Sequence, residues 1–125
     1  MIKKLEDFNV CVAIVGFRNV KIMDVKGFFN LVRKRVKGAH VQFFDATLIA
    51  GWEHLYFASL NALNAFKSKQ NISNSLAVEA LLFASAQRQI SKAVEMLGIR
   101  PESSQVAVLI IAETRQKATA ALEII

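Results

Sequence analysis

The sequence has few of the residues that would indicate a disulfide framework, a metal centre or a membrane span. Its single cysteine, Cys11, lies in an apolar run, so no internal disulfide can form and we expect a small buried side chain. Its two histidines, His40 and His54, have no cysteine or carboxylate beside them at the spacing of metal ligands. No apolar run reaches about 18 residues without a charge, and the N-terminus is too charged for a convincing signal peptide. We therefore expect a cytosolic protein without a metal or a membrane contact.

Sequence motifs of the common enzyme classes are also absent. There is no Walker loop, no GxGxxG fingerprint and no GxSxG elbow. Glu79 could act as a general base, but a lone carboxylate in an apolar helix segment more often supports the helix N-terminus or pairs with a basic residue. Because catalysis needs converging acid, base or metal groups, the sequence predicts a protein that is not an enzyme and that has no small-molecule substrate. An unrecognised hydrolase is the least favoured alternative.

Acidic side chains are scarce in the first third of the chain. Residues 1–40 hold nine Lys and Arg against three acids, whereas the remaining residues hold seven of each sign. The whole net charge of +6 therefore lies in the first third. This distribution is typical of a surface that meets phosphates or an acidic partner. The alternative is a surplus of lysines that only serves solubility.

Length and hydrophobic patterning predict one domain over residues 1–125, because a chain of this size with 54% apolar residues can bury one core. Strands are expected at 8–17, 40–49 and 106–112, and helices at about 24–37, at 52–67, and from 113 or 114 onward. Asp24 is the expected cap of the first helix, and Asp45 predicts a bend in the second strand. The order β-α-β-α-α-β-α predicts an α/β (α+β) fold, with a small mixed sheet packed with helices around a buried central helix.

The stretch from Asn71 to Gly98 is the predicted central helix. It opens with Asn and Ser side chains that can cap helix N–H groups, and it ends at a glycine that is soon followed by proline. Its first half is apolar almost all round, which is typical of a buried helix. In its second half Ile90, Val94 and Leu97 continue the core stripe, while polar residues cover the other face. We therefore expect one helix with a buried start and a polar end.

Two other helical faces have a composition that suits RNA. On the helix of residues 24–37, four cations fall on one face, so that their potentials add at one phosphate backbone. They are Lys26, Arg33, Lys34 and Lys37. An ordinary solvated face is the alternative. On the helix of residues 52–67, Phe57 lies with His54, Asn61 and Asn64 on a face that could stack on unpaired bases, although Phe57 could equally pack against the central helix.

Two long phrases resemble a known family. QFFDATLIAGWEHLYFASLNALNAF (residues 42–66) and NISNSLAVEALLFASAQRQISKAVEMLG (residues 71–98) resemble the small archaeal subunit of the KEOPS complex. This is the Cgi-type family, whose human member is the PRPK-binding protein. The similarity is strong over about residues 40–98, and the flanking strands and last helix fit the family order more loosely.

The resemblance implies a non-catalytic, regulatory subunit of a tRNA-processing complex. That complex makes N6-threonylcarbamoyladenosine at position 37 of tRNA, and a separate sugar-kinase-like subunit performs the transfer. The Cgi-type subunit binds and stimulates a small atypical kinase/ATPase subunit, and it binds tRNA at the single-stranded 3′ CCA end. The resemblance implies no cofactor and no metal.

The resemblance assigns the RNA contacts to the opening of the central helix and to two cations further along it. These residues are Asn71, Ser73, Asn74, Ser75, Arg88 and Lys92. Free N–H groups at a helix start favour phosphate, Ile72 could wedge against a base, and Arg88 could stack on a base or bind phosphate. The Asn and Ser residues could equally be simple helix caps. From charge and spacing alone, the four cations of residues 26–37 would form a secondary track for the tRNA backbone.

The resemblance places the kinase partner near the C-terminal strand and helix, where we assign the contact to Leu109, Ile111, Leu122 and Ile125. Large aliphatic residues at the end of the chain, Ile124 and Ile125, suit either their own core or a partner interface. Two alternatives stay open. One is a free-standing RNA-binding module without a kinase partner, and the other is a purely structural kinase-regulatory adaptor without direct RNA contact.

Overall fold

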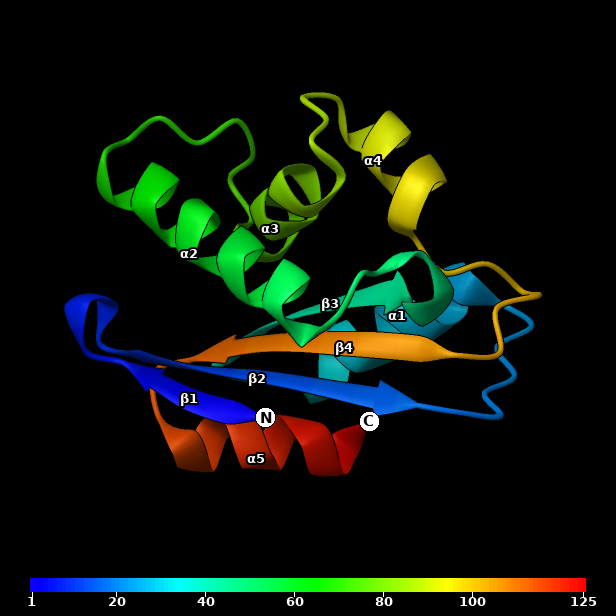
Figure 1. The fold of residues 1–125 in the computed structure, drawn as a ribbon. Coiled ribbons are helices and arrows are strands. Elements are labelled where there is room, and N and C mark those ends of the chain that lie inside the picture. The colour runs from blue at the N-terminus through cyan, green and yellow to red at the C-terminus, as the bar shows by residue number, and fades with distance from the viewer.

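The computed structural model describes residues 1–125 as a four-stranded sheet with helices on both faces (Figure 1). The sheet order is β1-β2-β4-β3 and every neighbouring pair is antiparallel. The elements are β1 (Ile2–Leu5), β2 (Val10–Phe17), α1 (Val25–Arg35), β3 (Ala39–Asp45), α2 (Trp52–Lys67), α3 (Leu76–Ser85), α4 (Ile90–Leu97), β4 (Val106–Ala112) and α5 (Arg115–Ile124). The predicted α/β class is confirmed, but the predicted mixed sheet is wrong because all three strand pairs are antiparallel. β1 is a strand that was not predicted from the sequence.

Strand β4 is the centre of the sheet. All seven of its residues are buried, because β2 and β3 flank it and helices cover both of its faces. This position explains its unbroken apolar sequence, since a strand that is covered on both faces does not alternate with polar residues. β1 has the opposite character: it is an edge strand of four residues with two exposed lysines, paired with β2 from Ile2↔Ala13 to Leu5↔Val10.

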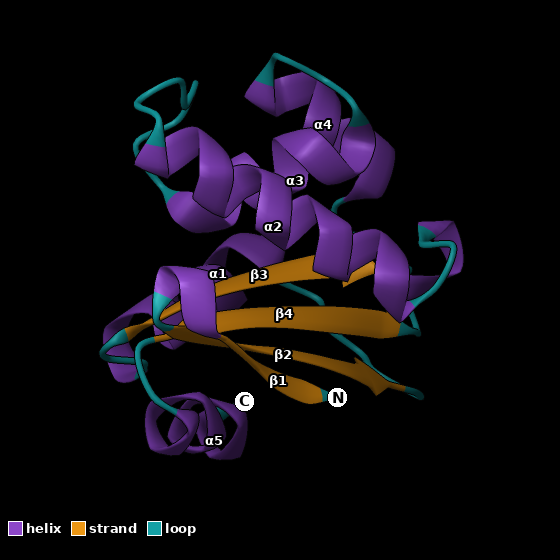
Figure 2. Cartoon of the chain, turned by 60° about the vertical axis from the view of Figure 1, so that its left-hand side comes forward, coloured by secondary structure: helices purple, strands orange, loops and turns teal.

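The two faces of the sheet carry two hydrophobic cores. On one face, α2, α3 and α4 pack over Phe44, Leu109 and Ile111. On the other face, α5 and α1 pack over side chains of the opposite parity, such as Val108 and Ile110. Figure 2 shows α2, α3 and α4 on one side of the sheet and α5 on the other. None of the helices has the length and hydropathy needed to cross a membrane.

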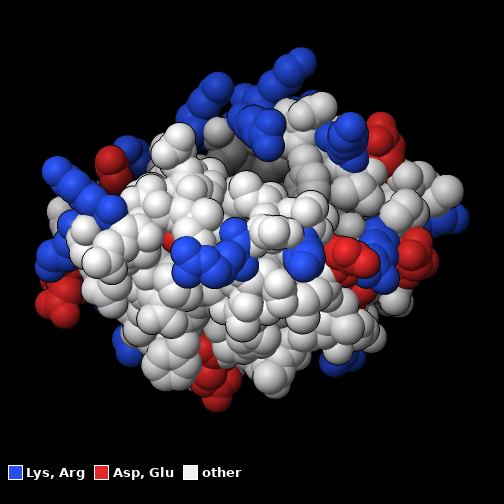
Figure 3. Space-filling view, turned by 90° about the horizontal axis from the view of Figure 1, so that it is seen from above, with Lys and Arg blue, Asp and Glu red and all other residues white.

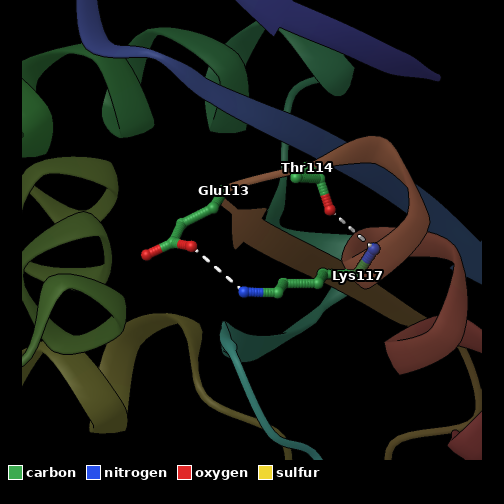
Figure 4. A network of polar contacts seen from close by, with 3 residues as sticks. All are labelled: Glu113, Thr114 and Lys117. Carbon is green, nitrogen blue, oxygen red and sulfur yellow. Dashed lines mark hydrogen bonds and ion pairs between the residues drawn. The ribbon is translucent and has the colours of Figure 1, made fainter.

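The predicted starts of the first and last helices are confirmed, whereas the strand predicted over residues 40–49 ends at Asp45 instead of bending there and continuing. The Asp24 carboxylate accepts a hydrogen bond from the Gly27 N–H at 3.0 Å and caps α1. β3 ends at Asp45, whose carboxylate caps the short turn that follows by accepting from the Thr47 N–H at 3.0 Å. At α5, the Thr114 hydroxyl accepts from the Lys117 N–H at 3.1 Å, and the Lys117 ammonium lies 3.0 Å from the Glu113 carboxylate (Figure 4). This pair is the only salt bridge in the chain.

The predicted central helix is two helices, so the expectation of one helix over residues 71–98 is wrong. α3 ends at Ser85, and Ala86 adopts a left-handed conformation with φ 55°. The Ala86 and Gln87 N–H groups close the last turn on the carbonyls of Phe83 and Leu82. A straight helix over the whole stretch would be about 42 Å long, whereas a strand of seven residues spans about 24 Å. The break therefore leaves the apolar half, α3, on the sheet, while α4 packs mainly against α3.

Candidate functional site

The basic stripe, which we define as Lys26, Arg33, Lys34 and Lys37, is fully on the surface. All four side chains are exposed; three lie on α1, and Lys37 lies two residues beyond its end. None of them is ion-paired, because Lys117 is the only paired cation in the chain. Arg33 and Lys34 also stand in the last turn of α1, where positive charge is favourable beside the helix C-terminus. The charge of the stripe is therefore available to a partner.

Several cations surround a hollow on the face of the molecule that α2, α3 and α4 cover (Figure 3). Figure 3, seen from the side of α2, α3 and α4, shows several Lys and Arg side chains standing around a hollow, with the acidic side chains farther out. A surface of this kind attracts polyanions, because closely spaced cations raise the local potential together.

The loop Asn71–Ser75 is held from inside by a buried carboxylate. The Glu79 side chain is 1% exposed and accepts hydrogen bonds from the Ile72 N–H at 3.1 Å and the Ser73 N–H at 2.8 Å. Glu79 therefore binds main-chain amides before α3, and it has no basic partner. Glu79 holds the Ile72 and Ser73 amides and the Ser75 hydroxyl holds the Val78 amide, so these three N–H groups are not free for phosphate.

The side chains of the loop are largely used inside the loop. Ser73 is buried and its hydroxyl accepts from the Ser75 N–H at 3.1 Å, so the predicted RNA contact of Ser73 is contradicted. The Ser75 hydroxyl accepts from the Val78 N–H at 3.3 Å, which confirms the capping alternative for this residue. The Asn71 amide donates to the Ser73 carbonyl at 2.9 Å. Two members of the predicted set, Ile72 and Asn74, are exposed.

Arg88 and Lys92 are exposed but do not continue a helix from the loop. Arg88 lies in the linker after α3, and Lys92 lies in the first turn of α4. The whole of α3, about 15 Å long, separates them from Ser75 along the chain. The two cations remain accessible, and neither is ion-paired.

The start of α2 carries exposed aromatic rings. Trp52 is 50% and Phe57 is 58% exposed, so the alternative in which Phe57 packs against the central helix is wrong. Tyr56 lies edge-on to both rings, and the Lys3 ammonium lies 5.1 Å from the centre of the Tyr56 ring.

His54, near the start of α2, connects this helix to the end of α3 by hydrogen bonds. Its Nδ1 accepts from the Ala50 N–H at 3.2 Å, and its Nε2 lies 2.8 Å from the Ala84 carbonyl oxygen.

Of the four residues predicted to contact the kinase, two are buried and two lie partly at the surface. Leu109 and Ile111 are each 1% exposed within β4, so these two residues have no surface for a partner and their assignment is wrong. Leu122 and Ile125 are half-buried at the C-terminal end of α5. Ile125 lines a fully apolar pocket of about 130 Å³, together with side chains of Phe17, Val20, Ile22, Phe28, Phe43, Val106 and Val108. This end of α5 therefore offers apolar surface.

A groove of about 410 Å³ lies between α1, the outer edge of β3, and α3 with α4. Ile90 and Val94 of α4 line it and are 47% and 46% exposed, so their placement in a core stripe is wrong. Arg33 and His40 also line it, and partial burial lowers the pKa of the His40 imidazole. No sequence pattern indicated this site, because four elements that are distant in sequence build it.

A family model described as kinase binding protein CGI-121 matches residues 17–125. The matched span includes α1, the groove, the loop Asn71–Ser75 and α5, and it leaves β1 and most of β2 outside. A search of curated proteins finds no match.

Proposed function

The chain belongs to the CGI-121 family of kinase-binding proteins, and from this membership we propose that it is the small, non-catalytic subunit of the KEOPS tRNA-modification complex. In this proposal it binds and stimulates the kinase/ATPase subunit and also binds tRNA, at or near the 3′ CCA end. The family membership carries the kinase-binding part of the proposal. The unpaired cations of the basic stripe support the tRNA part, because such cations neutralise phosphates without first leaving an internal partner.

A non-catalytic role agrees with the engagement of Glu79. Both of its carboxylate oxygens accept hydrogen bonds from main-chain amides of the loop, and the side chain is buried. A general base needs to reach the proton that it abstracts. Glu79 would have to leave two amides unpaired to do so.

For the kinase contact we propose the C-terminal end of α5. Leu122 and Ile125 lie there half-buried, Ile124 is 41% exposed, and an apolar pocket opens beside Ile125. Apolar anchors that fill such a pocket supply most of the binding energy of an interface. We expect Ile125→Asp to weaken association with the kinase subunit at least about tenfold while the fold is retained, and Glu123→Gln, an exposed change on the same helix, to have little effect.

For the RNA contact we propose that Arg88, Lys92 and the exposed Ile72 meet the tRNA 3′ end, while the basic stripe follows the backbone. The experiment is a binding titration of the isolated protein with intact tRNA and with the same tRNA lacking its 3′ CCA. We expect weaker binding after truncation, and Arg88→Glu is expected to reproduce the loss. Arg115→Glu, an exposed reversal at the start of α5, serves as the charge-matched control.

Equal binding of both tRNAs would contradict the 3′-end contact and leave the backbone contact of the stripe. Absence of binding to either tRNA would favour the second candidate, a purely structural kinase-regulatory adaptor. One observation favours that candidate: the polar side chains of Ser73, Ser75 and Asn71 are already bonded within the loop.

A further inference from the structure

We infer that the outer edge of β3 binds an extended, acidic segment of a protein partner by strand addition. β3 is the last strand of the sheet, and five consecutive residues, Ala39 to Phe43, line the groove. Successive side chains of a strand point to opposite faces, so a strand that lines a cavity with consecutive residues presents its edge to it. This contact is separate from the kinase contact at α5 and from the contact proposed for the tRNA 3′ end, and it shares Arg33 with the proposed contact to the tRNA backbone.

The main-chain groups on this edge face the groove in a defined pattern. The Phe43 N–H points away from β4, because it donates to Oε1 of Gln42 at 3.0 Å. Main-chain groups alternate between the two sides of an antiparallel strand, so Val41 and Ala39 face the same way as Phe43. Their N–H and C=O groups are the ones with which an added strand would pair.

The Gln42 side-chain amide already binds the Phe43 N–H on this edge, in the place of the peptide group of an added strand. Its Oε1 accepts from the Phe43 N–H, and its Nε2 donates to the Ala77 carbonyl of α3 at 3.3 Å. A carboxamide has the same donor and acceptor pair as a peptide group. The edge is therefore suited to an amide partner, and pairing with an added strand would begin on the Ala39 side of Phe43.

The walls of the groove define the side chains of the segment. Val25 and Phe29 of α1 and Ile90 and Val94 of α4 give apolar contact on both sides. Arg33 is the one member of the basic stripe that lines the groove, and it has no ion-pair partner. Apolar residues that alternate with acidic residues would match both features. A second copy of this chain does not match them, because pairing β3 with β3 would bring two basic α1 helices together.

A peptide suits the groove better than an RNA base. The two phenyl rings that line it, those of Phe29 and Phe43, pack on each other with centroids 5.5 Å apart, and Phe43 is 2% exposed. Stacking of a base needs an open aromatic face, whereas strand addition needs open main-chain groups.

The test uses the full chain and a capped synthetic peptide in which valine alternates with glutamate, with the same seven-residue length as β3. Binding is measured by fluorescence anisotropy, and the contact is located by the amide NMR shifts of Ala39, Val41 and Phe43. We expect Val41→Pro to weaken binding about tenfold, because proline removes an edge N–H that does not pair with β4. The control is Lys4→Pro, which removes an N–H from the free side of the other edge strand, β1.

The acidic character of the bound segment is tested separately, by reversing the charge of Arg33 and by changing the charge of the peptide. We expect Arg33→Glu to weaken binding of the glutamate peptide severalfold, and Arg115→Glu on α5 to leave it unchanged. A peptide in which lysine replaces glutamate is expected not to bind. Equal binding of both peptides would contradict the acidic character of the segment.

Several results would overturn the inference. These are no binding of the glutamate peptide, full binding by Val41→Pro, or shifts of the β3 amides with single-stranded poly(A) RNA but not with the peptide. Circular dichroism checks that Val41→Pro folds. If it does not fold, methylation of alternate backbone nitrogens of the peptide replaces it, since this removes the donors of the added strand. Unchanged affinity of the methylated peptide would equally overturn strand addition.

Discussion

The loop Asn71–Ser75 and the basic stripe are both polar, but they differ in whether their polar groups already have partners within the chain. In the loop, side chains bond to the loop itself, and the buried Glu79 holds two of its amides. In the stripe, four cations stand in solvent without one internal partner. Polar groups that are already bonded must lose those bonds before they bind a ligand, whereas free cations lose only water and counterions.

This difference separates a structural role from a binding role. Substitutions of the loop's bonded polar side chains, Asn71, Ser73 and Ser75, should change the free energy of unfolding and affect RNA binding only through the fold. Substitutions in the stripe should change RNA binding and leave the free energy of unfolding almost unchanged.

The largest effect is expected for Glu79→Ala. It leaves the Ile72 and Ser73 amides without their acceptor in a buried place, and hydrogen bonds to charged groups are the stronger ones. We expect a loss of about 3 kcal/mol in the free energy of unfolding, measured by urea denaturation. Glu79→Gln keeps one acceptor oxygen and should lose about half as much.

The control for Glu79 is Glu123→Ala, which removes an exposed acid from α5. Its free energy of unfolding should stay within about 0.5 kcal/mol of the parent protein. If Glu79→Ala were no less stable than this control, the buried carboxylate would not hold the loop.

The second effect is expected for the triple variant Lys26→Ala, Arg33→Ala, Lys34→Ala. We expect tRNA affinity to fall about tenfold or more, equivalent to about 1.4 kcal/mol, with little change in stability. The slope of log affinity against log salt should decrease by about 2, because each lost phosphate contact removes about 0.7 to 0.9. The measurement is a tRNA titration at several salt concentrations.

The matched control removes three exposed cations elsewhere, Lys4, Lys67 and Arg115. The same loss in this variant would show that net charge, rather than the stripe, drives binding. That result would remove the distinction between the stripe and the rest of the surface.

The helix α1 and the central strand could be predicted because local signals agreed with their environment. Asp24 caps α1 as expected, and the unbroken apolar run of β4 matches a strand covered on both faces. Exposure of the basic stripe also followed from sequence, since charged residues on one helical face are rarely buried. For these elements local pattern and tertiary position give the same answer.

The rest could not be predicted because tertiary geometry decided it. The stretch from residue 71 to 98 has a helical pattern throughout, but α3 ends at Ser85 and Ala86 adopts a left-handed conformation. The bonds of Glu79 depend on how the loop folds back over α3, which no spacing reveals. The groove forms only because the fold brings α1 and α4 beside the same strand edge. Leu109 cannot contact a kinase because β4 lies in the middle of the sheet.

A smaller effect is expected for Ser75→Ala, which removes the cap of α3. The Ser75 hydroxyl accepts from the Val78 N–H, and such caps contribute about 1 kcal/mol to stability. Ser104→Ala is the control, because the Ser104 hydroxyl is exposed and makes no hydrogen bond within the chain. Equal urea midpoints for the two variants would contradict a capping role, and a tRNA affinity that fell without a change in stability would move Ser75 from the structural to the binding group.

The smallest effect is a pH dependence of the free energy of unfolding, which arises from His40 in the groove that Ser75 of the loop and Arg33 of the basic stripe also line. Burial lowers the pKa of His40 below its ordinary value of 6.5, so the folded protein holds the His40 proton less strongly than the unfolded chain does. The resulting stability is fully present above pH 6.5 and is lost as the pH falls through the folded pKa. His40→Gln should remove this dependence from urea midpoints measured between about pH 7.5 and 5.5.

Asp45 gives the reference for the pH experiment, because it responds in a lower range. Desolvation raises the pKa of Asp45, but hydrogen bonds from Thr47 and Ser103 and the charge of Arg100 outweigh it and lower the pKa below 3.8. Its stability is present above pH 3.8 and is lost only as the pH falls through the folded pKa. A loss near pH 6 that persisted in His40→Gln would therefore belong neither to His40 nor to Asp45, and it would show that groups outside the groove respond to pH in that range.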